Sequence, residues 1–325
     1  MHDRFKIGAR DSFREEVLKI GAAESIPRSG RCDPGFFEST LDGMAMAAKT
    51  IDRFPSSVIE PPSVKSGLQS FLLRLYKTAS ASGVTSTTWG RFVFEWCYER
   101  YKVFFEVGDI RVLRSLIQPG TTVIDVGANV GFFTKQFGRW VSAGGRVIAI
   151  EPEEANFARL NRMIARNTLS AAVETIQAVA AETNGTLKLE INPFHPADHK
   201  ISEQGIPVKA VSLDHVLEER QWPPVSLIKI DVQGAEERVL RGAPRTIERF
   251  HPALFLEMDG EALRKMNSDA GRLLGRLTGE GYSIHRLERG RISAPLPAAR
   301  TMALCQGGRY ADFLFLYCPE SDLRS

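Results

Sequence analysis

The chain of 325 residues lacks the features that mark several special classes of protein. It has only four cysteines, Cys32, Cys97, Cys305 and Cys318, and no two of them form a C-x-x-C pair. Such scarcity is not typical of a disulfide scaffold or a zinc site, and it favours reduced, buried thiols. No run approaches the roughly 18 apolar residues that a membrane-spanning helix needs. The sequence therefore predicts an ordinary globular fold.

An excess of charge of one sign is also lacking. The 42 Lys and Arg residues nearly balance the 39 Asp and Glu residues and leave a net charge of +3. A protein that binds nucleic acid usually carries a concentrated basic excess, so no nucleic-acid partner is indicated. The N-terminal run MHDRFKIGARDSFREEV has no apolar core, which is not the pattern of a secretory signal. We expect a cytoplasmic protein with no membrane partner.

The pattern of the sequence changes near residue 105. Residues 1–104 have irregular Pro and Gly punctuation and end in an aromatic-rich run, and we expect a mainly helical N-terminal region there. Residues 105–325 alternate short apolar runs with amphipathic stretches, which is typical of a mostly parallel sheet with helices on both faces. This second region therefore predicts an α/β, doubly wound, Rossmann-like domain.

The elements of that domain can be placed from the apolar pattern. Strands are predicted over 122–126, 146–150, 173–178, 226–231 and 253–257, with two closing strands over 281–287 and 312–318. Helices are predicted over 131–142, 154–167, 234–241 and 261–279.

The segment TTVIDVGANVGFFTKQF combines a buried strand, a glycine-containing turn and the start of a helix. In a doubly wound sheet, an adenosine cofactor sits at this first strand-to-helix turn. We expect Gly127 to let the backbone turn and a ligand approach closely, and Gly131 to let helix and strand pack tightly. N–H groups at the helix start attract an anion. The pattern Asp125-x-Gly127-x-Asn129-x-Gly131 therefore predicts a cofactor site.

The residues of this turn also favour one adenosine cofactor over another. A nicotinamide site prefers G-x-G-x-x-G, whose glycines accommodate a pyrophosphate. Here Asp125 ends the strand, and its carboxylate would repel a pyrophosphate but suit the ammonium of a methionine group. Because S-adenosylmethionine has such a group and no phosphate, we predict it as the cofactor. A nicotinamide-dependent dehydrogenase is the alternative.

Two further residues are predicted to contact the cofactor. Glu151 ends the next strand, where an acid can accept both ribose hydroxyls, and we expect it to face an open cleft. The alternative is that Glu151 only caps the helix after Pro152. The third strand ends near Ala178, which is predicted to lie at the adenine, with an ordinary core position as the alternative.

Four ordered segments resemble the FkbM family of S-adenosylmethionine-dependent methyltransferases. They are VIDVGANVGFF, VIAIEPEEANFARLNRMIARN, VSLDHVLEE and VSLIKIDVQGAEERVLRGA, within about residues 105–260 and more loosely to 318. The resemblance implies a class I Rossmann-like methyltransferase fold and methylation of hydroxyls on polyketides, sugars and related natural products. The family's usual Asp-Val-Glu-Gly-Ala-Glu block occurs at residues 231–236 with Gln233 in place of the first Glu, which removes one charge.

The acceptor side is predicted at the carboxyl ends of two later strands, where Asp231 and Glu257 lie. An alcohol is a poor nucleophile until it loses its proton, so an acid there suits a base or an anchor for the acceptor. Lys229 and Asp231 share a face of their strand, so a buried ion pair without a catalytic role is the alternative. A divalent cation held by Asp231, Glu257 and Asp259 is less favoured, and no metal site is predicted.

Two histidines and several charged residues complete the set of candidates. His195 and His199 lie in the polar segment NPFHPADHK, which could fold over the acceptor and accept its proton. Solvated loop histidines are the alternative. Glu236 opens a predicted helix, where the helix dipole favours an acid. The arginines between 238 and 249 are expected on a solvated helix face.

These features together predict an S-adenosylmethionine-dependent O-methyltransferase with a small-molecule hydroxyl acceptor. A non-catalytic Rossmann-like scaffold is the alternative of a different class, and the intact glycines and Glu151 argue against it. The sequence leaves the acceptor and the oligomeric state open, a homodimer included.

Overall fold

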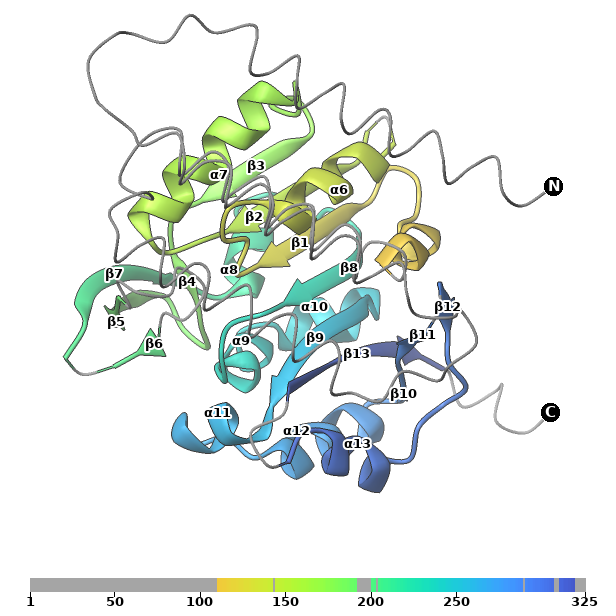
Figure 1. Cartoon of the computed structure of the whole chain (residues 1–325). Helices are drawn as coiled ribbons and strands as arrows, with labels where there is room; N and C mark the ends of the chain where they lie inside the picture. Colours follow the sequence, from red (N-terminus) through yellow and green to blue (C-terminus); the bar gives the residue numbers. More distant parts are fainter. Residues whose placement is uncertain are drawn as a thin grey trace, which may run out of the picture. The chain divides into compact units, whose positions relative to one another are not determined.

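The computed structural model describes residues 110–142, 144–191, 200–202, 204–288, 290–306 and 310–318. The predicted helical region 1–104 lies outside these residues. Among those described, seven strands form one sheet in the order β10-β13-β9-β8-β1-β2-β3 (Figure 1). The strands are β1 Thr122–Val126, β2 Arg146–Ile150, β3 Val173–Ile176, β8 Val225–Ile230, β9 Ala253–Asp259, β10 Tyr282–His285 and β13 Tyr310–Tyr317.

Most strands of this sheet are parallel. Strands β3, β2, β1, β8 and β9 pair in parallel, and β13 lies antiparallel between β9 and β10. Parallel neighbours need crossover connections, which put helices on the faces of the sheet. The expected α/β, doubly wound, Rossmann-like fold is therefore confirmed, together with its two closing strands.

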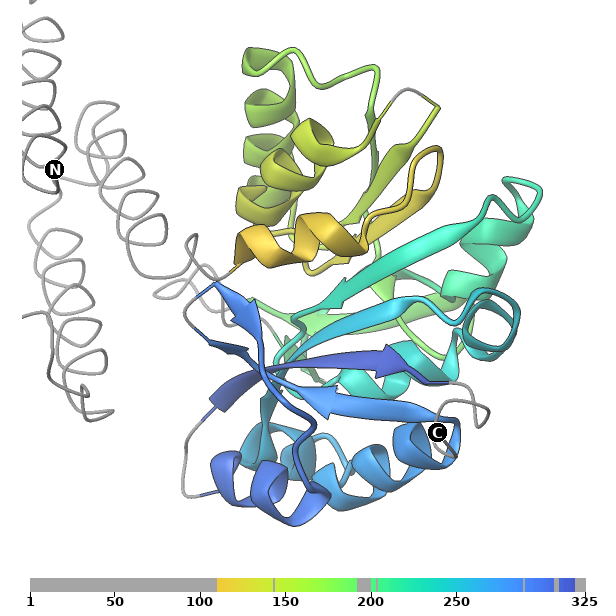
Figure 2. The same cartoon turned by 90° about the vertical axis from the view of Figure 1, so that its right-hand side faces the viewer.

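Helices cover both faces of the sheet, and in Figure 2 the yellow-green helices lie at the opposite end of the domain from the blue ones. One face carries the 3-10 helix η2 Arg111–Leu116 and helices α6 Phe132–Trp140 and α7 Glu154–Arg166. The other carries α8 Leu213–Glu218, α9 Glu236–Arg241, α10 Pro244–Phe250, α11 Gly260–Lys265, α12 Ala270–Gly279 and α13 Ala298–Leu304. In the part of the chain that the structure describes, no helix is long and apolar enough to cross a membrane.

The two central strands, β1 and β8, are buried along their whole length, as expected for parallel strands that are covered on both faces. Their alternate residues pack into two core clusters. Ile124 and Ile228 lie in one cluster, and Val123 and Leu227 lie in the other. Burial of each large aliphatic side chain contributes about 1.5–3 kcal/mol. These strands therefore form the rigid frame that positions the loops at their carboxyl ends.

Two of the predicted elements are divided in the structure. The strand expected over 173–178 ends at Ile176, and β4 Val179–Ala180 joins a second sheet of order β4-β7-β5-β6. The helix expected over 261–279 is two helices, because Asn267 adopts a left-handed φ of 57° and Asp269 caps α12 at the Arg272 N–H. The other strands of the small sheet are β5 Gly185–Glu190, β6 Lys200–Ile201 and β7 Ile206–Val211; β11 Leu287–Glu288 and β12 Arg291–Ile292 form a hairpin.

Candidate active site

Acidic residues gather in one row at the carboxyl edge of the large sheet. Val126 of β1 pairs with Ile150 and Ile230 in its two neighbours, and Ile230 pairs with Leu256. The next residue along each strand therefore continues the same row. This row consists of Glu151, Gly127, Asp231, Glu257 and, opposite Glu257 on β13, Asp312. The topology thus brings three of the predicted site acids to one edge.

The turn between β1 and α6 is tied to the end of β2. The N–H groups of Gly127 and Ala128 both donate to the Ile150 carbonyl at 3.0 Å. The Asn129 N–H donates to the Glu151 carboxylate, Oε2, at 2.8 Å. Asn129 has a left-handed φ of 50°, a conformation that Asn tolerates better than most residues. The turn and the end of the next strand are therefore one hydrogen-bonded unit.

Both glycines of this turn are required by contacts within the protein. Gly127 has a φ of 73°, and a Cβ there would lie 1.9 Å from the carbonyl oxygen of Asp231. Gly131 has a φ of 94°, and a Cβ there would lie 2.3 Å from Met163 and 2.7 Å from Leu160 of α7. The left-handed φ of Gly127 agrees with the expected backbone turn, and this glycine also makes room for the loop after β8. The reason expected for Gly131 is corrected, because it makes room for helix α7 and not for a strand.

Glu151 is a buried acid that joins two loops. Its Oε2 accepts from Asn129, and its Oε1 accepts from the Glu153 N–H at 3.0 Å. Its exposed fraction is only 4%, and burial raises its pKa to about 7, so the expectation of an open cleft around it is wrong. The helix-cap alternative is also wrong, because Glu153 caps α7 by accepting from the N–H groups of Ala155 and Asn156.

Two residues predicted to bind the cofactor have almost no exposed surface. Asp125 is completely buried; its Oδ2 accepts from the Thr134 hydroxyl at 2.6 Å, and its Oδ1 lies 3.4 Å from Lys229 Nζ. Ala178 is 1% exposed and packs in the larger core cluster. This conformation does not support direct contact between the Asp125 carboxylate and a ligand ammonium. A contact of Ala178 with adenine would have to come from its backbone.

Lys229 connects the two predicted halves of the site. Its Nζ donates to the Gly127 carbonyl at 3.0 Å, and it lies 3.3 Å from Asp231 Oδ2. The Lys229 side chain is 4% exposed, whereas that of Asp231 is 25% exposed. The Lys229–Asp231 ion pair of the alternative interpretation is therefore present, and Asp231 still has surface that an acceptor could reach.

The loop after β8 turns tightly before α9. Gln233 and Gly234 have left-handed φ values of 53° and 96°, and a Cβ on Gly234 would lie 2.5 Å from the backbone of Ala262. Glu236, which is 1% exposed, accepts from the Gly234 N–H at 3.0 Å through Oε1, while its Oε2 has no hydrogen-bond partner among the described residues. Burial, and less strongly the charge of Asp231, raises the pKa of Glu236 to about 7. Glu236 does lie in the first turn of α9, as the sequence predicts, but its side chain is buried there.

The acids of the less favoured metal interpretation have other roles in the fold. Glu257 is partly buried on β9. Asp259 caps α11 by accepting from the N–H groups of Glu261 and Ala262 at 2.8 and 3.2 Å. Within the described ranges, no group of three His, Cys, Asp or Glu side chains could hold a metal ion. Asp231, Glu257 and Asp259 thus form no such group.

The remaining candidates lie away from this edge or outside the described part of the chain. His195 and His199 fall in residues 192–199, which are not described, so their catalytic roles stay predictions. The described neighbours Glu190 and Lys200 pair with each other in the small sheet, so this segment connects two antiparallel strands.

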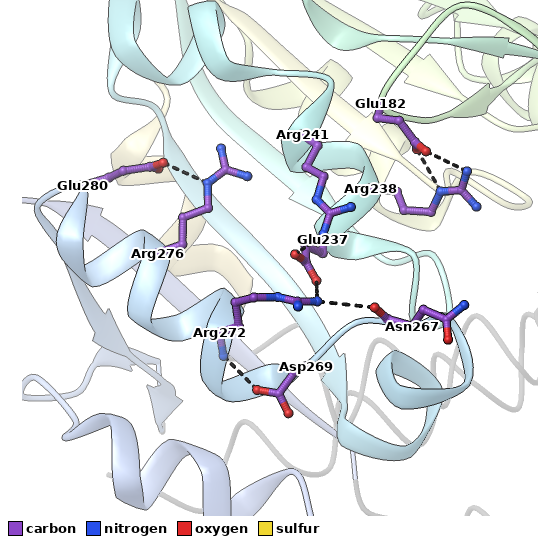
Figure 3. A network of polar contacts seen from close by, with 9 residues as sticks. All are labelled: Glu182, Glu237, Arg238, Arg241, Asn267, Asp269, Arg272, Arg276 and Glu280. Carbon is purple, nitrogen blue, oxygen red and sulfur yellow. Dashed lines mark hydrogen bonds and ion pairs between the residues drawn. The ribbon is translucent and has the colours of Figure 1, made fainter.

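The arginines expected on one solvated helix face lie on two helices, and two of them are ion-paired to buried or partly buried acids (Figure 3). Arg238 pairs with Glu182 at 2.8 Å, and Arg241 and Arg272 pair with Glu237 at 2.5 and 3.1 Å. Burial opposes ionisation of Glu237, but hydrogen bonds from its partners outweigh it and lower its pKa to about 2. These arginines therefore stabilise the fold around α9 and α12.

The edge formed by the turn after β1 and by Glu151 offers hydrogen-bond acceptors to a ligand that carries hydroxyl groups. An ionised carboxylate has about four lone-pair positions, and Glu151 uses two of them for backbone N–H groups. Two positions remain, which match two vicinal ribose hydroxyls. Asp231 lies at the neighbouring strand end, where it can accept a hydrogen bond from a second ligand.

Comparison with known proteins matches residues 125–284 to a family model described as the methyltransferase FkbM domain. The chain is 27% identical to the hexuronic acid methyltransferase AglP of Haloferax volcanii, with 43% of this chain and 56% of the relative covered. It is 28% identical to the 31-O-demethyl-FK506 methyltransferase FkbM of Streptomyces tacrolimicus, with 39% and 60% covered. The chain thus spans less than two thirds of the length of these relatives. A solved methyltransferase FkbM from Methylobacillus flagellatus is 16% identical, with 76% of this chain and 57% of that chain covered and a TM-score of 0.38.

Proposed function

The chain carries a methyltransferase domain of the FkbM family, and from this premise we propose that it transfers a methyl group from S-adenosylmethionine to a hydroxyl of a small molecule. The observation that carries the proposal is the unit formed by the turn 127–131 and Glu151. A glycine turn, an acid at the next strand end and a second acid on the neighbouring strand provide a place for a nucleoside beside a place for an acceptor.

We assign a separate role in cofactor binding to each residue around the turn. Glu151 accepts hydrogen bonds from the ribose hydroxyls, and its raised pKa means that ligand binding favours loss of its proton near neutral pH. Asp125 forms a buried ion pair with Lys229 and so helps to position the site, without contacting the ligand itself. The backbone of the turn and of Ala178 lines the remaining side of the nucleoside.

The acceptor side needs only a positioned base. When bound, S-adenosylmethionine supplies a methyl group on a sulfonium, which is already activated for transfer. Asp231 would hold the acceptor hydroxyl at the strand end and accept its proton, while the cofactor would supply the methyl group and leave as the neutral thioether S-adenosylhomocysteine. Its partly exposed carboxylate at the carboxyl edge supports this role. Glu257, His195 and His199 are further candidates for contact with the acceptor.

A hydroxyl acceptor is the choice that the name of one relative favours, because that relative acts on 31-O-demethyl-FK506. The other is a methyltransferase of a hexuronic acid, which has both hydroxyls and a carboxyl group. We therefore propose a hydroxyl of a sugar or of a hydroxylated natural product as the acceptor class.

Two measurements test this proposal in sequence. In a thermal-shift series, S-adenosylmethionine and S-adenosylhomocysteine at 100 times their Kd should each stabilise the fold by about 2.7 kcal/mol. Transfer of a labelled methyl group into a library of sugars and hydroxylated natural products should then identify an acceptor. Stabilisation by NAD alone would support the dehydrogenase alternative instead, and cofactor binding without transfer to any acceptor would support the scaffold.

A further inference from the structure

The ammonium of Lys229 lies where three segments of the chain meet. Within 3.4 Å of its Nζ are the Gly127 carbonyl in the turn after β1, Asp125 Oδ1 in β1 and Asp231 Oδ2 in the loop after β8. The ammonium donates a hydrogen bond to the Gly127 carbonyl and lies within ion-pair distance of the two carboxylate oxygens. Among the described residues, Asp125 Oδ1 has no hydrogen-bond partner, so this ion pair is its polar contact. The ring of Phe133 at the start of α6 lies 5.0 Å from Nζ and adds a cation–π contact.

The position of this ammonium is fixed from the buried side. Asp125 is completely buried, and its second carboxylate oxygen is held by the Thr134 hydroxyl at 2.6 Å. Lys229 is itself 3% exposed, so the pair is shielded from water and its geometry is restrained on all sides. Only Asp231 among the three oxygen partners keeps appreciable side-chain exposure, at 25%.

The backbones of the two loops also touch. A Cβ at Gly127 would lie 1.9 Å from the carbonyl oxygen of Asp231, so the turn after β1 packs directly on the loop after β8. The Lys229 ammonium bonds the carbonyl of this same Gly127. Any shift of the turn is therefore transmitted to Asp231 through both its backbone and its carboxylate.

We propose that Lys229 is a positioning residue for methyl transfer, which holds the Asp231 carboxylate at a fixed place relative to the turn 127–131. Binding of the cofactor on the turn and orientation of Asp231 toward the acceptor are coupled through this ammonium. If Lys229 only stabilised the fold, its contacts with Asp125 and the Gly127 carbonyl would be sufficient. Its third contact, with Asp231 on the acceptor side, is what a positioning role requires. The inference rests on the proposed function, since Asp231 acts on the acceptor only if the chain is a methyltransferase.

The test must remove the ammonium without leaving a buried carboxylate unpaired. The double variant Asp125→Asn, Lys229→Met removes both charges together and keeps the size of both side chains. With saturating S-adenosylmethionine and the acceptor found for the wild-type enzyme, we expect kcat to fall about 10- to 100-fold, as for a misplaced catalytic group. In an Asp231→Asn background the same double change should lower kcat by less than about twofold, because Lys229 acts through Asp231.

A control on the same two strands separates this effect from loss of stability. Ser226→Ala removes a buried hydrogen bond of 2.7 Å between β8 and Thr121 at the opposite edge of the sheet, and it should leave kcat within about twofold of wild type. Lys229→Arg gives a second test if the double variant does not fold. It keeps the charge that Asp125 needs but changes the geometry at Asp231, so it should lower kcat with the fold intact.

The outcomes distinguish failure of this inference from failure of the proposed function. Wild-type protein that methylates no acceptor overturns the proposed function before the variants are compared. Active wild-type protein together with a folded double variant of unchanged kcat overturns the positioning role. A loss of kcat that is equally large in the Asp231→Asn background does so as well, since Lys229 would then act independently of Asp231.

Discussion

The two loops at the carboxyl edge of the sheet, 127–131 after β1 and 231–236 after β8, are each hydrogen-bonded to a buried glutamate, but the two carboxylates differ in their number of hydrogen-bond partners. Glu151, which serves the first loop, accepts one backbone N–H on each oxygen. Glu236, in the second loop, accepts from Gly234 on one oxygen, and its other oxygen has no hydrogen-bond partner among the described residues. Burial raises the pKa of both to about 7.

The two loops therefore differ in the free energy of their buried carboxylates, because only that of Glu151 has a hydrogen-bond partner on both oxygens. A buried polar atom without a partner costs about 1–3 kcal/mol. Three N–H groups of the first loop, from residues 127 to 129, are hydrogen-bonded to the end of β2 and to Glu151, which favours one conformation of the loop. Each loop also has one non-glycine residue with a left-handed φ, Asn129 at 50° in the first and Gln233 at 53° in the second, and Asn tolerates this conformation better than Gln. The backbone strain is therefore larger at Gln233, two residues from Asp231.

The largest expected effect is at Asp231. The variant Asp231→Asn keeps the size of the side chain and leaves Lys229 paired with Asp125, so the fold should survive. Turnover should fall about 100-fold or more, as for loss of a positioned base. Affinity for S-adenosylhomocysteine should change little, since the first loop is untouched. Steady-state kinetics with isothermal titration calorimetry measure both, and wild-type turnover in this variant would remove Asp231 from the mechanism.

A second test concerns the contribution of the buried Glu236 carboxyl to the stability of the fold at different pH. Its pKa of about 7 in the fold exceeds the ordinary value of 4.5, so its contribution to stability is present below pH 4.5 and is lost as the pH rises through 7. Glu236→Gln should therefore be more stable than wild type at pH 8, by about 2–3 kcal/mol. Urea denaturation at pH 5 and pH 8 measures the difference.

The neighbouring residue Glu237 provides the matched control. Its pKa is lowered to about 2 by Ser268, Arg272 and Arg241 despite burial, so Glu237→Gln should lower stability at pH 8. A loss of stability in both variants at pH 8 would contradict the assignment of opposite roles to these adjacent acids.

A third test concerns Glu151. Glu151→Ala should weaken binding of S-adenosylhomocysteine by roughly 10- to 150-fold, because hydrogen bonds to a charged group contribute about 1.5–3 kcal/mol. It should also lower stability, since the N–H groups of Asn129 and Glu153 lose their acceptor. Glu153→Ala is the control: it removes the cap of α7 and should cost about 1 kcal/mol of stability with unchanged affinity. Calorimetry and denaturation midpoints of both variants decide whether Glu151 binds ligand or only joins the loops.

The smallest expected effect is the pH dependence of cofactor binding. Hydroxyl donors on the ligand favour ionised Glu151, whose pKa is about 7 in the free protein. The Kd for S-adenosylhomocysteine should therefore be about tenfold higher at pH 6 than at pH 8. Glu151→Gln should remove this dependence, whereas Glu153→Ala should keep it. A flat profile in wild-type protein would indicate that Glu151 keeps one protonation state during binding.

Much of the fold could be predicted from local patterns. The strands over 122–126 and 146–150 have the predicted bounds, because continuous apolar runs between turn residues are buried in a parallel sheet. The split of 261–279 could not be predicted from apolar spacing, which continues across the break. Asn267 and Asp269 gave a local signal for it, as a left-handed residue and a helix cap.

For the candidate site, too, local sequence patterns predicted some features and not others. Apolar strands that end in an acid or a glycine predicted that Glu151, Asp231 and Glu257 would meet at one edge. Burial of those residues could not be predicted, because it depends on which loops cover them. The same is true of Glu236, whose place at a helix start is typical of a solvated acid but which is 1% exposed.

The sequence by itself determined most of the succession of strands and helices along the chain, the glycine turn and the residue types at the strand ends, because these depend on neighbours within a few positions. Only the tertiary structure decided what each residue touches. Position 127 must be glycine because the carbonyl of Asp231, more than 100 residues later in the chain, packs against it. Lys229 contacts both Asp125 and Asp231 because β1 and β8, distant in sequence, are adjacent in the sheet. Contacts of this kind depend on strand order and register, which no local pattern specifies.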